Sequence, residues 1–411
     1  MRLATANTYD NTLANMTNRQ AGLAELQEKL SAGKKVVRPS DDPTGAAQAE
    51  RAMTRSARVD VEVRALNLQR NSVAMAEGTL GNSLDLLQTM RQLMVSAGDA
   101  AYNPSDRTSI AQEMAGLRDQ LFTYANKKDT NGIPLFSGLG SAPQPFVDVP
   151  AGVVYNGIPG SRASTAVSIP GTMDGQAVWM NVPTGNGVFN LNLGTNIVPP
   201  LGPNKGQLWT DVGQVLDPSA LTGNNYTVTF NVTATIPPVT TYDVSMTTVL
   251  PPITTTPVLT AQPYTDGQDI AFDGLTFVAR GVPANGDTLT ITPSTRDDFF
   301  ALLDQAITAI KGAGNGHQLA QDLSLALAQI DSGMERVQSA RSQAGELLKR
   351  ADIIEGTQEE KSIQLAADRS RAEDMDMIKG ISEFQNQQTG YDAALKTYAQ
   401  IQRLSLFNYL G

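Results

Sequence analysis

The sequence predicts a mainly α-helical protein: a long antiparallel helical rod or coiled coil built from both chain ends, with an all-β domain inserted in the middle. Two observations support this prediction. Of the 22 prolines, 19 fall between Pro134 and Pro293, whereas the flanking regions are rich in the helix formers Ala, Leu, Gln, Glu and Arg. Residues 140–293 contain no Glu, three Lys or Arg and nine Asp, in short segments separated by Pro and Gly.

Residues 362–411 carry a seven-residue repeat that predicts one helix with a single apolar stripe. The two slots of the repeat are spaced alternately by four and three residues, which places them on one helix face. No proline follows Pro293, so the sequence predicts that this helix continues unbroken to the chain end. One slot holds Met377, Phe384, Tyr391 and Tyr398, and the other holds Ile381, Gln388, Leu395 and Gln402.

Residues 3–30 carry a matching stripe, with the same alternation of three and four residues. Residues 1–40 hold six Lys or Arg against three Asp or Glu, and residues 352–411 hold six against ten. We therefore expect the two ends to pair along their stripes, with charge helping the choice of partner. The alternative is two separate surface helices. The first stripe consists of Ala6, Tyr9, Leu13, Met16, Gln20, Leu23, Gln27 and Leu30.

Local signals set the limits of the next helices. Gly33 suits the left-handed cap of the first helix. Asp42 as N-cap before Pro43 predicts the start of a helix that runs to about residue 97, so we interpret the Asp41–Asp42 pair as capping residues and not as catalytic carboxylates. Ser105 is the expected cap of a third helix. The expected buried positions are Val73, Leu80, Leu87 and Met94, with Ala76, Ser83, Met90 and Ala97 beside them, and then Ile110, Met114, Leu117, Leu121 and Tyr124.

The central window predicts strands and turns. Tyr226, Val228 and Phe230 alternate with polar residues, as in a half-buried strand. Asp273-Gly274 lies between two short apolar segments and predicts a two-residue hairpin turn. Another strand is expected at Leu289–Ile291, after the turn Asn285-Gly286. The sequence does not determine the topology of this window, or whether it forms one subdomain or two.

The helical pattern returns at Asp297. A short amphipathic helix is expected to contain Phe299, Phe300, Leu303, Ile307 and Ile310, and a long helix to contain Leu323, Ile330, Val337, Ala344 and Ala351. The long helix can pack against the earlier helices as an antiparallel bundle. Three domains follow: terminal coiled-coil arms at 1–43 and 355–411, a helical rod at 44–139 and 297–354, and an outward-facing β domain at 140–296.

Composition argues against several classes of function. The net charge of −10 disfavours a nucleic-acid groove. The chain has no Cys and only one His, His317, so neither a thiolate metal site nor a catalytic motif is predicted. We expect no enzyme activity, no cofactor and no metal. The first residues lack the apolar core of a secretory signal peptide, and no apolar run is long enough to span a membrane.

Several short segments resemble the bacterial flagellin family. In the first half these are Leu30–Lys35, Pro39–Pro43, Asp106–Arg107, Leu117–Leu121, Ala125–Asn126 and Leu135–Gly138. In the last part they are Ala372–Met375 and Ser405–Leu410. The resemblance covers about residues 1–139 and 297–411. The closing segment 398–407 and Pro39–Pro43 favour a member of the hook–filament junction over a filament flagellin. In the central window only Tyr155–Gly160 and Gly281–Asp287 are similar to family members.

The resemblance implies a structural subunit exported through the flagellar type III apparatus, without a cleaved signal peptide, to the outside of the cell. Its arms would be disordered until assembly and would then form the inner coiled coil of a ring or helix of copies. Its expected partners are further copies, hook-associated protein 1, flagellin or the filament cap, and an export chaperone at the C-terminal arm. The alternatives are a filament flagellin, or a surface adhesin or enzyme carried by the β domain. The expected assembly interface consists of Leu13, Met16, Leu23, Leu30, Met377, Ile381, Phe384, Tyr391, Leu395, Tyr398, Leu404 and Phe407.

Overall fold

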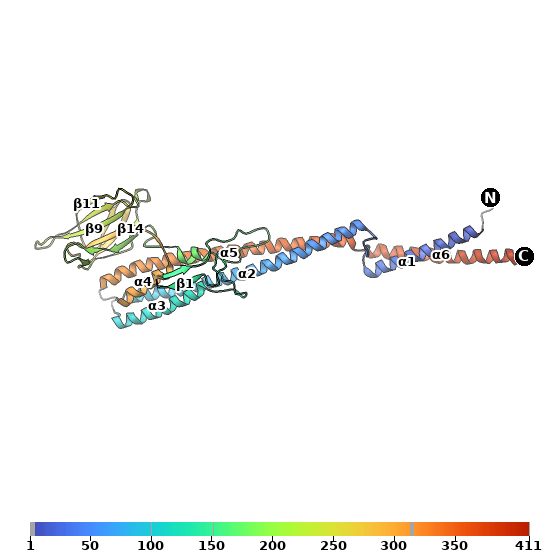
Figure 1. Ribbon diagram of the computed structural model, residues 1–411, viewed down its shortest axis with the longest axis horizontal. Coiled ribbons are helices and arrows are strands. Elements are labelled where there is room, and N and C mark those ends of the chain that lie inside the picture. The colour runs from blue at the N-terminus through green and yellow to red at the C-terminus, as the bar shows by residue number, and fades with distance from the viewer. Residues whose placement is uncertain (1–4, 100, 151, 313–315, 411) are drawn as a thin grey trace. The chain divides into compact units, whose positions relative to one another are not determined.

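The computed structural model describes residues 5–99, 101–150, 152–312 and 316–410, and in the two terminal helices it describes side chains from residue 10 onward and up to residue 400. The chain forms two compact units: residues up to Ala65 together with those from Ile353 onward, and Leu66–Asp352. The helices are α1 (Thr5–Ala32), α2 (Pro43–Ala97), α3 (Pro104–Ala125), α4 (Phe299–Gly312), α5 (Gly316–Glu373) and α6 (Met377–Leu410) (Figure 1).

The strands all lie between α3 and α4, as the sequence predicts. The longer ones are β1 (Phe146–Val149), β2 (Gly152–Tyr155), β4 (Phe189–Leu193), β9 (Asn225–Val232), β10 (Thr240–Thr247), β11 (Thr255–Pro263), β12 (Gln268–Phe272), β13 (Leu275–Arg280) and β14 (Thr288–Pro293). Two-residue strands are β3 (Val182–Pro183), β5 (Thr195–Asn196), β6 (Gly202–Pro203), β7 (Trp209–Thr210), β8 (Gln214–Val215) and β15 (Arg296–Asp297). A π-helix η1 (Gln176–Met180) and a 3-10 turn η2 (Pro218–Ala220) complete this region.

Capping chemistry sets most helix starts. Asp42 caps α2 as predicted, because its Oδ1 accepts hydrogen bonds from the backbone N–H groups of Thr44 and Gly45, both at 3.0 Å. The prediction of Ser105 as the cap of α3 is wrong. Asn103 is the cap: its side chain accepts from the N–H of Asp106 at 3.0 Å, and Asp106 accepts in return from the N–H of Asn103 at 3.2 Å. This capping box satisfies two free N–H groups, with Pro104 at the first helical position.

The prediction of one unbroken helix over residues 362–411 is also wrong. The chain leaves the helix between Glu373 and Met377, which separates α5 from α6. There Asp374 forms an antiparallel bridge with Lys34, and the N–H of Met375 donates to the carbonyl of Gly33 at 3.0 Å. Asp376 then caps α6. The break is stable because backbone groups that lose their helical partners form hydrogen bonds with Gly33 and Lys34, which are distant in sequence.

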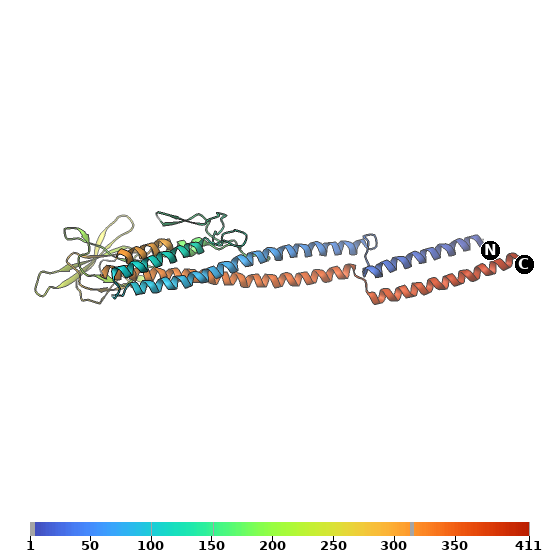
Figure 2. The same cartoon turned by 90° about the horizontal axis from the view of Figure 1, so that it is seen from below.

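The seven-residue patterns of α2 and α5 form the core of the helical part of the Leu66–Asp352 unit. Ion pairs of Arg70 with Asp352, Glu77 with Arg341 and Arg91 with Asp331 show that the two helices are antiparallel. The predicted positions on these two helices are buried: Val73, Ala76, Leu80, Ser83, Leu87, Met90, Met94 and Ala97 on α2, and Leu323, Ile330, Val337, Ala344 and Ala351 on α5. On α3 the prediction holds for Ile110, Met114 and Leu121, but Leu117 and Tyr124 are only half-buried. Helices α3 and α4 lie beside this pair in both views (Figures 1 and 2).

The central window contains two structural parts. Its first part, around the β1–β2 hairpin and η1, packs on the helices. Phe300 of α4 lies at the centre of an aromatic cluster, with ring centroids 5.6 Å from Phe122, 6.1 Å from Trp179 and 6.4 Å from Phe146. Trp179 also contacts Phe136 edge-on at 6.1 Å. The rings fix this part of the window to the helical bundle, which the sequence alone does not show.

Arg118 of α3 holds the same region together through charge. It is 6% exposed and donates to Asp148 of β1 and, at 3.0 Å, to Asp304 of α4. Its guanidinium carbon lies 5.7 Å from the ring centres of both Phe122 and Phe300. Burial alone would lower the pKa of Arg118, but the hydrogen bond to Asp148 and the charge of Asp304 raise it above the usual value. Arg118 therefore cross-links three elements.

The second part is a β-sandwich with one core. A five-stranded antiparallel sheet in the order β11-β10-β9-β14-β4 faces a smaller sheet of β12, β13 and β7, with β8 also paired to β13. The predicted alternation on β9 is confirmed, since Tyr226, Val228 and Phe230 are buried. The predicted hairpin is confirmed as well: Asp273 and Gly274 have φ of 43° and 77°, as a type I′ turn requires. Side chains of both sheets form a single hydrophobic cluster.

Candidate assembly interface

The predicted pairing of the chain ends is present: α1 and α6 lie side by side and antiparallel in both views (Figures 1 and 2). Glycines mark the register. A Cβ on Gly22 would lie 3.5 Å from Oε1 of Gln387, one on Gly390 would lie 2.8 Å from Nη1 of Arg19, and one on Gly380 would lie 3.0 Å from Leu30. Small residues on α6 therefore allow close approach to side chains of α1.

The predicted interface residues separate into two groups. Met16, Leu23, Leu30, Phe384, Tyr391 and Tyr398 are half-buried, and Leu13, Met377, Ile381 and Leu395 are exposed. Leu404 and Phe407 lie outside the described side chains. Within residues 10–32 and 377–400, only Leu26 and Gly380 are buried. The helix pair therefore leaves most of its apolar stripe open to solvent.

Leu26 is the one interface residue that the sequence pattern missed. It is 8% exposed, the lowest value among the described apolar side chains of α1. The repeat assigned Gln27 to this level of the helix because Gln27 keeps the strict seven-residue spacing. The available signal was the set Leu23, Leu26 and Leu30, which is also spaced by three and four residues. The stripe on α1 is thus broader than one seam.

The energy of the pair follows from this burial. Complete burial of a leucine contributes roughly 1.5–3 kcal/mol. Fixing the backbone costs roughly 1–2 kcal/mol for every residue, and helical hydrogen bonds only partly offset this cost. α1 has 28 residues and α6 has 34. Among the described side chains of this pair, Leu26 is the one buried leucine, so further apolar surface would add to the stability of the pair.

Polar contacts fix the base of the arms, where residues 33–36 cross residues 371–375. The carbonyl of Glu373 accepts from the N–H of Lys35 at 2.8 Å, and the carboxylate of Glu373 pairs with Lys34 at 3.1 Å. The ammonium group of Lys35 donates to the carbonyl of Arg371 at 2.6 Å. Val36 and Ala372 are buried here. This crossing joins the two ends of the chain and holds α1 and α6 in register.

Charged pairs along the first arm are satisfied locally. Lys29 pairs with Glu25 one helical turn away at 2.6 Å, and this hydrogen bond is the main reason that the pKa of Lys29 is raised. Arg38, in the turn after α1, pairs with Glu28 at 2.8 Å. These exposed pairs contribute little to stability. Apolar area, and not charge, is therefore the main property that the arm offers to a partner.

The Asp41–Asp42 pair is structural, as predicted. Asp41 accepts from the N–H groups of Arg38 at 3.0 Å and Val37 at 3.1 Å, and the bond from Arg38 is the main cause of its lowered pKa. The pKa of Asp42 is lowered chiefly by the hydrogen bond from Gly45. Both groups are therefore ionised turn and cap residues at neutral pH. Neither has the raised pKa that a catalytic acid requires.

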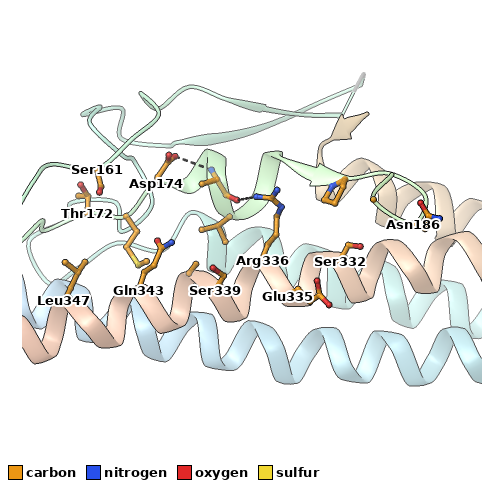
Figure 3. Close-up of a pocket in the computed structure, with 16 residues that line it drawn as sticks. Ser161, Thr172, Asp174, Asn186, Ser332, Glu335, Arg336, Ser339, Gln343 and Leu347 are labelled. Carbon is orange, nitrogen blue, oxygen red and sulfur yellow. Dashed lines mark hydrogen bonds between the residues drawn. The ribbon is translucent and has the colours of Figure 1, made fainter. Parts of the chain in front are cut away.

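Figure 3 shows a polar groove of about 470 Å³ between α5 and the segment before β3. Its two most reactive side chains serve the fold. Asp174 accepts from the N–H of Gln176 at 3.0 Å and that of Ala177 at 3.3 Å, and Arg336 donates to the carbonyl of Ala177 at 3.3 Å. Both point toward η1 in the figure. Asp174 and Arg336 are thus held by backbone groups of η1.

In the part of the chain that the structure describes, no group of three or more His, Asp or Glu side chains is arranged to hold a metal ion. In the same residues, none of the helices has an apolar stretch long enough to cross a bilayer. The arm pair is therefore the best-supported functional feature in the described part of the chain.

Both ends of the chain match a known family. Residues 3–141 match the bacterial flagellin N-terminal helical region, and residues 327–410 match the bacterial flagellin C-terminal helical region. Together these matches cover more than half of the chain. The chain therefore belongs to the bacterial flagellin family. The resemblance expected from the short segments is confirmed, and the β-sandwich lies between the two matched regions.

Individual relatives point to one branch of this family. The chain is 32% identical over 199 residues to flagellar hook-associated protein 3 of Salmonella typhimurium, covering 48% of this chain and 60% of that protein. It is 34% identical over 146 residues to the protein of the same name in Escherichia coli, covering 36% and 46%. The chain thus spans about half the length of these curated relatives. It is also 29% identical over 123 residues to flagellin B of Vibrio anguillarum.

Solved structures agree on the fold. The hook-associated protein 3 of Legionella pneumophila superposes with a TM-score of 0.68 at 28% identity, over 77% of this chain and 97% of that one. A structure of the flagellar junction protein of the same organism gives 0.65 at 27% identity, over 74% and 99%. The long terminal helices with inserted antiparallel strands, predicted from the sequence, are thus confirmed as an arrangement known in this family.

Proposed function

We propose that this protein is a structural subunit of the bacterial flagellum that forms an adaptor ring between hook and filament. Copies assemble through their terminal helices into an inner coiled coil, and the β-sandwich is carried outside it. The proposal is supported by the family match at both ends and by relatives that are named flagellar hook-associated protein 3 and flagellar junction protein. The subunit has a mechanical role and does not act as an enzyme.

One observation carries the assembly part of the proposal. Within residues 10–32 of α1 and 377–400 of α6, only Leu26 and Gly380 are buried, although the apolar stripe extends along both helices. Arms of this kind are marginal in a single copy and stable in a bundle, because each added helix buries stripe that is otherwise solvated. We therefore assign residues 1–43 and 355–411 to the part that becomes ordered on assembly. The interface consists of the predicted residues together with Leu26.

The partners follow from a place at the hook–filament junction. Hook-associated protein 1 lies on the hook side, and flagellin or the filament cap lies on the other. Before assembly the C-terminal arm needs cover for its exposed stripe, and an export chaperone supplies it. The protein reaches the outside of the cell through the flagellar export apparatus without cleavage of a signal peptide.

Deletion of the gene separates this proposal from the alternative of a filament flagellin. We expect hooks without filaments and flagellin released into the medium. Normal filaments on normal hooks would exclude the adaptor function. Complementation then tests the arms: wild type and Asn386→Asp should restore filaments, whereas Leu395→Asp should not. Asn386 is an exposed polar residue of the same helix, so this control adds the same charge outside the apolar stripe.

A further inference from the structure

The β-sandwich carries a sequence feature that the assembly of the arms does not explain. Three loops share the pattern aliphatic-Pro-Pro-aliphatic: Val198–Leu201, Ile236–Val239 and Leu250–Ile253. The aliphatic residues that bound each loop are exposed, up to 100% for Ile236 and 78% for Leu250. Exposed apolar residues gathered in this way mark interaction sites in soluble proteins. Their positions on the sandwich indicate which partner they fit.

Two of these loops lie at one end of the sandwich, here called the Ile236 end. The N–H of Ile197 donates to the carbonyl of Gly286 at 2.8 Å. The N–H of Gly286 donates in turn to the carbonyl of Phe230, near the end of β9, at 2.8 Å. The loops before β6, after β9 and before β14 therefore meet. Their exposed aliphatic residues are Ile197, Val198, Leu201, Ile236, Val239 and Val282.

A buried carboxylate fixes the position of this end. Asp287 is completely buried and accepts four hydrogen bonds: from the side chain of Asn196 at 2.7 Å and from the N–H groups of Lys205, Gly206 and Ala284 at 2.8, 2.8 and 2.7 Å. Asn196 adjoins the Val198–Leu201 loop, Ala284 lies in the segment of Val282, and Lys205 and Gly206 follow β6. Asp287 thus pre-organises this part of the apolar surface, which lowers the entropy cost of binding. It also gives a structural role to the family-like segment 281–287.

The third loop lies at the opposite end, the Leu250 end. It joins β10 to β11, whereas the Ile236 loop joins β9 to β10, so the two loops stand at opposite ends of β10. Leu216 is nearby, because its N–H donates to the carbonyl of Gly274 in the β12–β13 turn at 2.8 Å. The exposed aliphatic residues of this end are Leu216, Val249, Leu250 and Ile253.

The two ends differ in charge. Lys205 is exposed at the Ile236 end, where its ammonium group donates to the carbonyl of Val198 at 2.7 Å. Arg280, Asp266 and Asp269 also lie toward this end, together with the buried carboxylate of Asp287. The Leu250 end has Asp217, next to Leu216, and Asp273 in the β12–β13 turn. The two cations of residues 189–293 therefore both lie at the Ile236 end, among carboxylates, whereas the charged side chains of the Leu250 end are all acidic, and both ends have apolar centres.

The rest of the sandwich is unsuited to self-association. Residues 189–293 hold seven Asp against two Lys or Arg, so its sides repel one another. The outer face of β9 and β10 presents Thr227, Thr229 and Asp243. The free edge strand β11 contains Pro257 and Pro263 and an irregular register, features that prevent strand addition. These features favour the approach of a second copy at the two ends.

We propose that the Ile236 end of one copy docks on the Leu250 end of the next. This contact joins two different surfaces of the same protein, so it repeats from copy to copy and matches a ring or helical assembly. Lys205 then approaches the acidic end of its neighbour, whereas contact between two Leu250 ends would oppose like charges. The inference extends the proposed function, which supplies neighbouring copies at high local concentration.

Cysteine cross-linking of the full chain tests the docking, because the protein has no cysteine of its own. Ile236→Cys and Leu250→Cys are purified separately, oxidised alone and as an equimolar mixture, and run on a non-reducing gel. We expect the mixture to give several times the dimer yield of either variant alone, because only the mixed pair brings the two cysteines together. Thr256→Cys, an exposed residue of the edge strand β11, is the control for random collision. Leu201→Cys and Ile253→Cys form a second pair in case a first variant misfolds.

A mixing experiment gives an independent reading by analytical ultracentrifugation, with Leu395→Asp in every chain to suppress contacts between arms. Ile236→Asp and Leu250→Asp should each self-associate at least about tenfold more weakly than the parent. Their equimolar mixture should recover dimers and no larger species, because one good interface remains. Homodimers of Ile236→Cys, or no cross-link above the Thr256→Cys control, would overturn the inference.

The two proposals fail in different ways. Absence of the mixed disulfide, with hooks that still need this protein to carry filaments, would remove only the contact between sandwiches. A mixed disulfide together with normal filaments after gene deletion would remove only the junction function.

Discussion

Replacement of Arg118 by leucine tests the proposed role of this residue in the helical part of the Leu66–Asp352 unit. The substitution removes hydrogen bonds to Asp148 and Asp304 and two ring contacts. Hydrogen bonds to charged groups contribute roughly 1.5–3 kcal/mol each. The lower limit applies here, because the side chains of Asp148 and Asp304 are 43% and 47% exposed and water takes over part of their solvation.

The ring contacts add roughly 0.5–1 kcal/mol each, and the leucine recovers part of the packing. We therefore expect a loss of about 2–3 kcal/mol in the free energy of unfolding. Both tryptophans, Trp179 and Trp209, lie in this unit, so fluorescence during urea denaturation reports on it directly.

Arg91→Leu is the matched control. Arg91 also pairs with an aspartate, Asp331 at 2.7 Å, but both side chains are about half exposed, and the expected loss is below about 1 kcal/mol. Arg118→Lys should fall between the two, because it keeps the charge and loses the planar fork that reaches two carboxylates. An effect of Arg118→Leu no larger than that of Arg91→Leu would refute the cross-linking role.

Three further predictions concern the arms, the core and the pH dependence. Leu395→Asp should abolish assembly and leave the tryptophan-monitored unfolding midpoint unchanged, because Leu395 is exposed and lies in the other compact unit; a shifted midpoint would contradict this. Gly333→Ala should lower the free energy of unfolding by about 1–3 kcal/mol, since the new Cβ would lie 2.3 Å from the ring of Phe299. The control Gly345→Ala on the same helix should be neutral or stabilising, because its Cβ meets nothing within 4 Å. Asp129→Asn should cost about 1 kcal/mol at pH 7. Burial opposes ionisation of Asp129, but hydrogen bonds from Ile133, Ser72 and Asn131 lower its pKa below the usual 3.8. The difference in unfolding free energy between wild type and variant is therefore present above pH 3.8 and should vanish as the pH falls further. A difference in stability that persists at about pH 2 would contradict this prediction.

Local rules predicted much of the fold. Seven-residue spacing identified the buried faces of α2 and α5, Asp42-Pro43 identified a helix start, and Asp273-Gly274 identified a hairpin. Each of these features depends on residues within one or two helical turns or on one tight turn. Their physical causes are therefore readable in the sequence alone.

The features that were missed depend on residues distant in sequence. No glycine or proline marks the break between α5 and α6, because residues 33–36 supply the backbone partners of Asp374 and Met375. Arg118 gave no signal, since its partners Asp148 and Asp304 lie 30 and 186 residues away. The sandwich topology likewise depends on pairings that composition does not specify.

The pairing of the two arms was predicted in outline. The stripes on both arms identified the right pair of helices. Part of each stripe is exposed in this pair, and its role in contacts between copies stays a prediction. Leu26 was missed because the strict seven-residue repeat selected its neighbour Gln27. The sequence also could not show which residues of the stripe are half-buried and which are exposed. That separation depends on the antiparallel register, which Gly22, Gly380 and Gly390 set through contacts across the pair.

Amide hydrogen exchange, measured on single copies in dilute solution and again on the assembled junction, tests the central claim most directly. The account predicts fast exchange in residues 1–43 and 355–411 of the single copy, slow exchange in the buried helices of the Leu66–Asp352 unit, and strong protection of the arms after assembly. Arms already protected in the dilute single copy would contradict it, because the ends would then be stable without the surface that other copies provide.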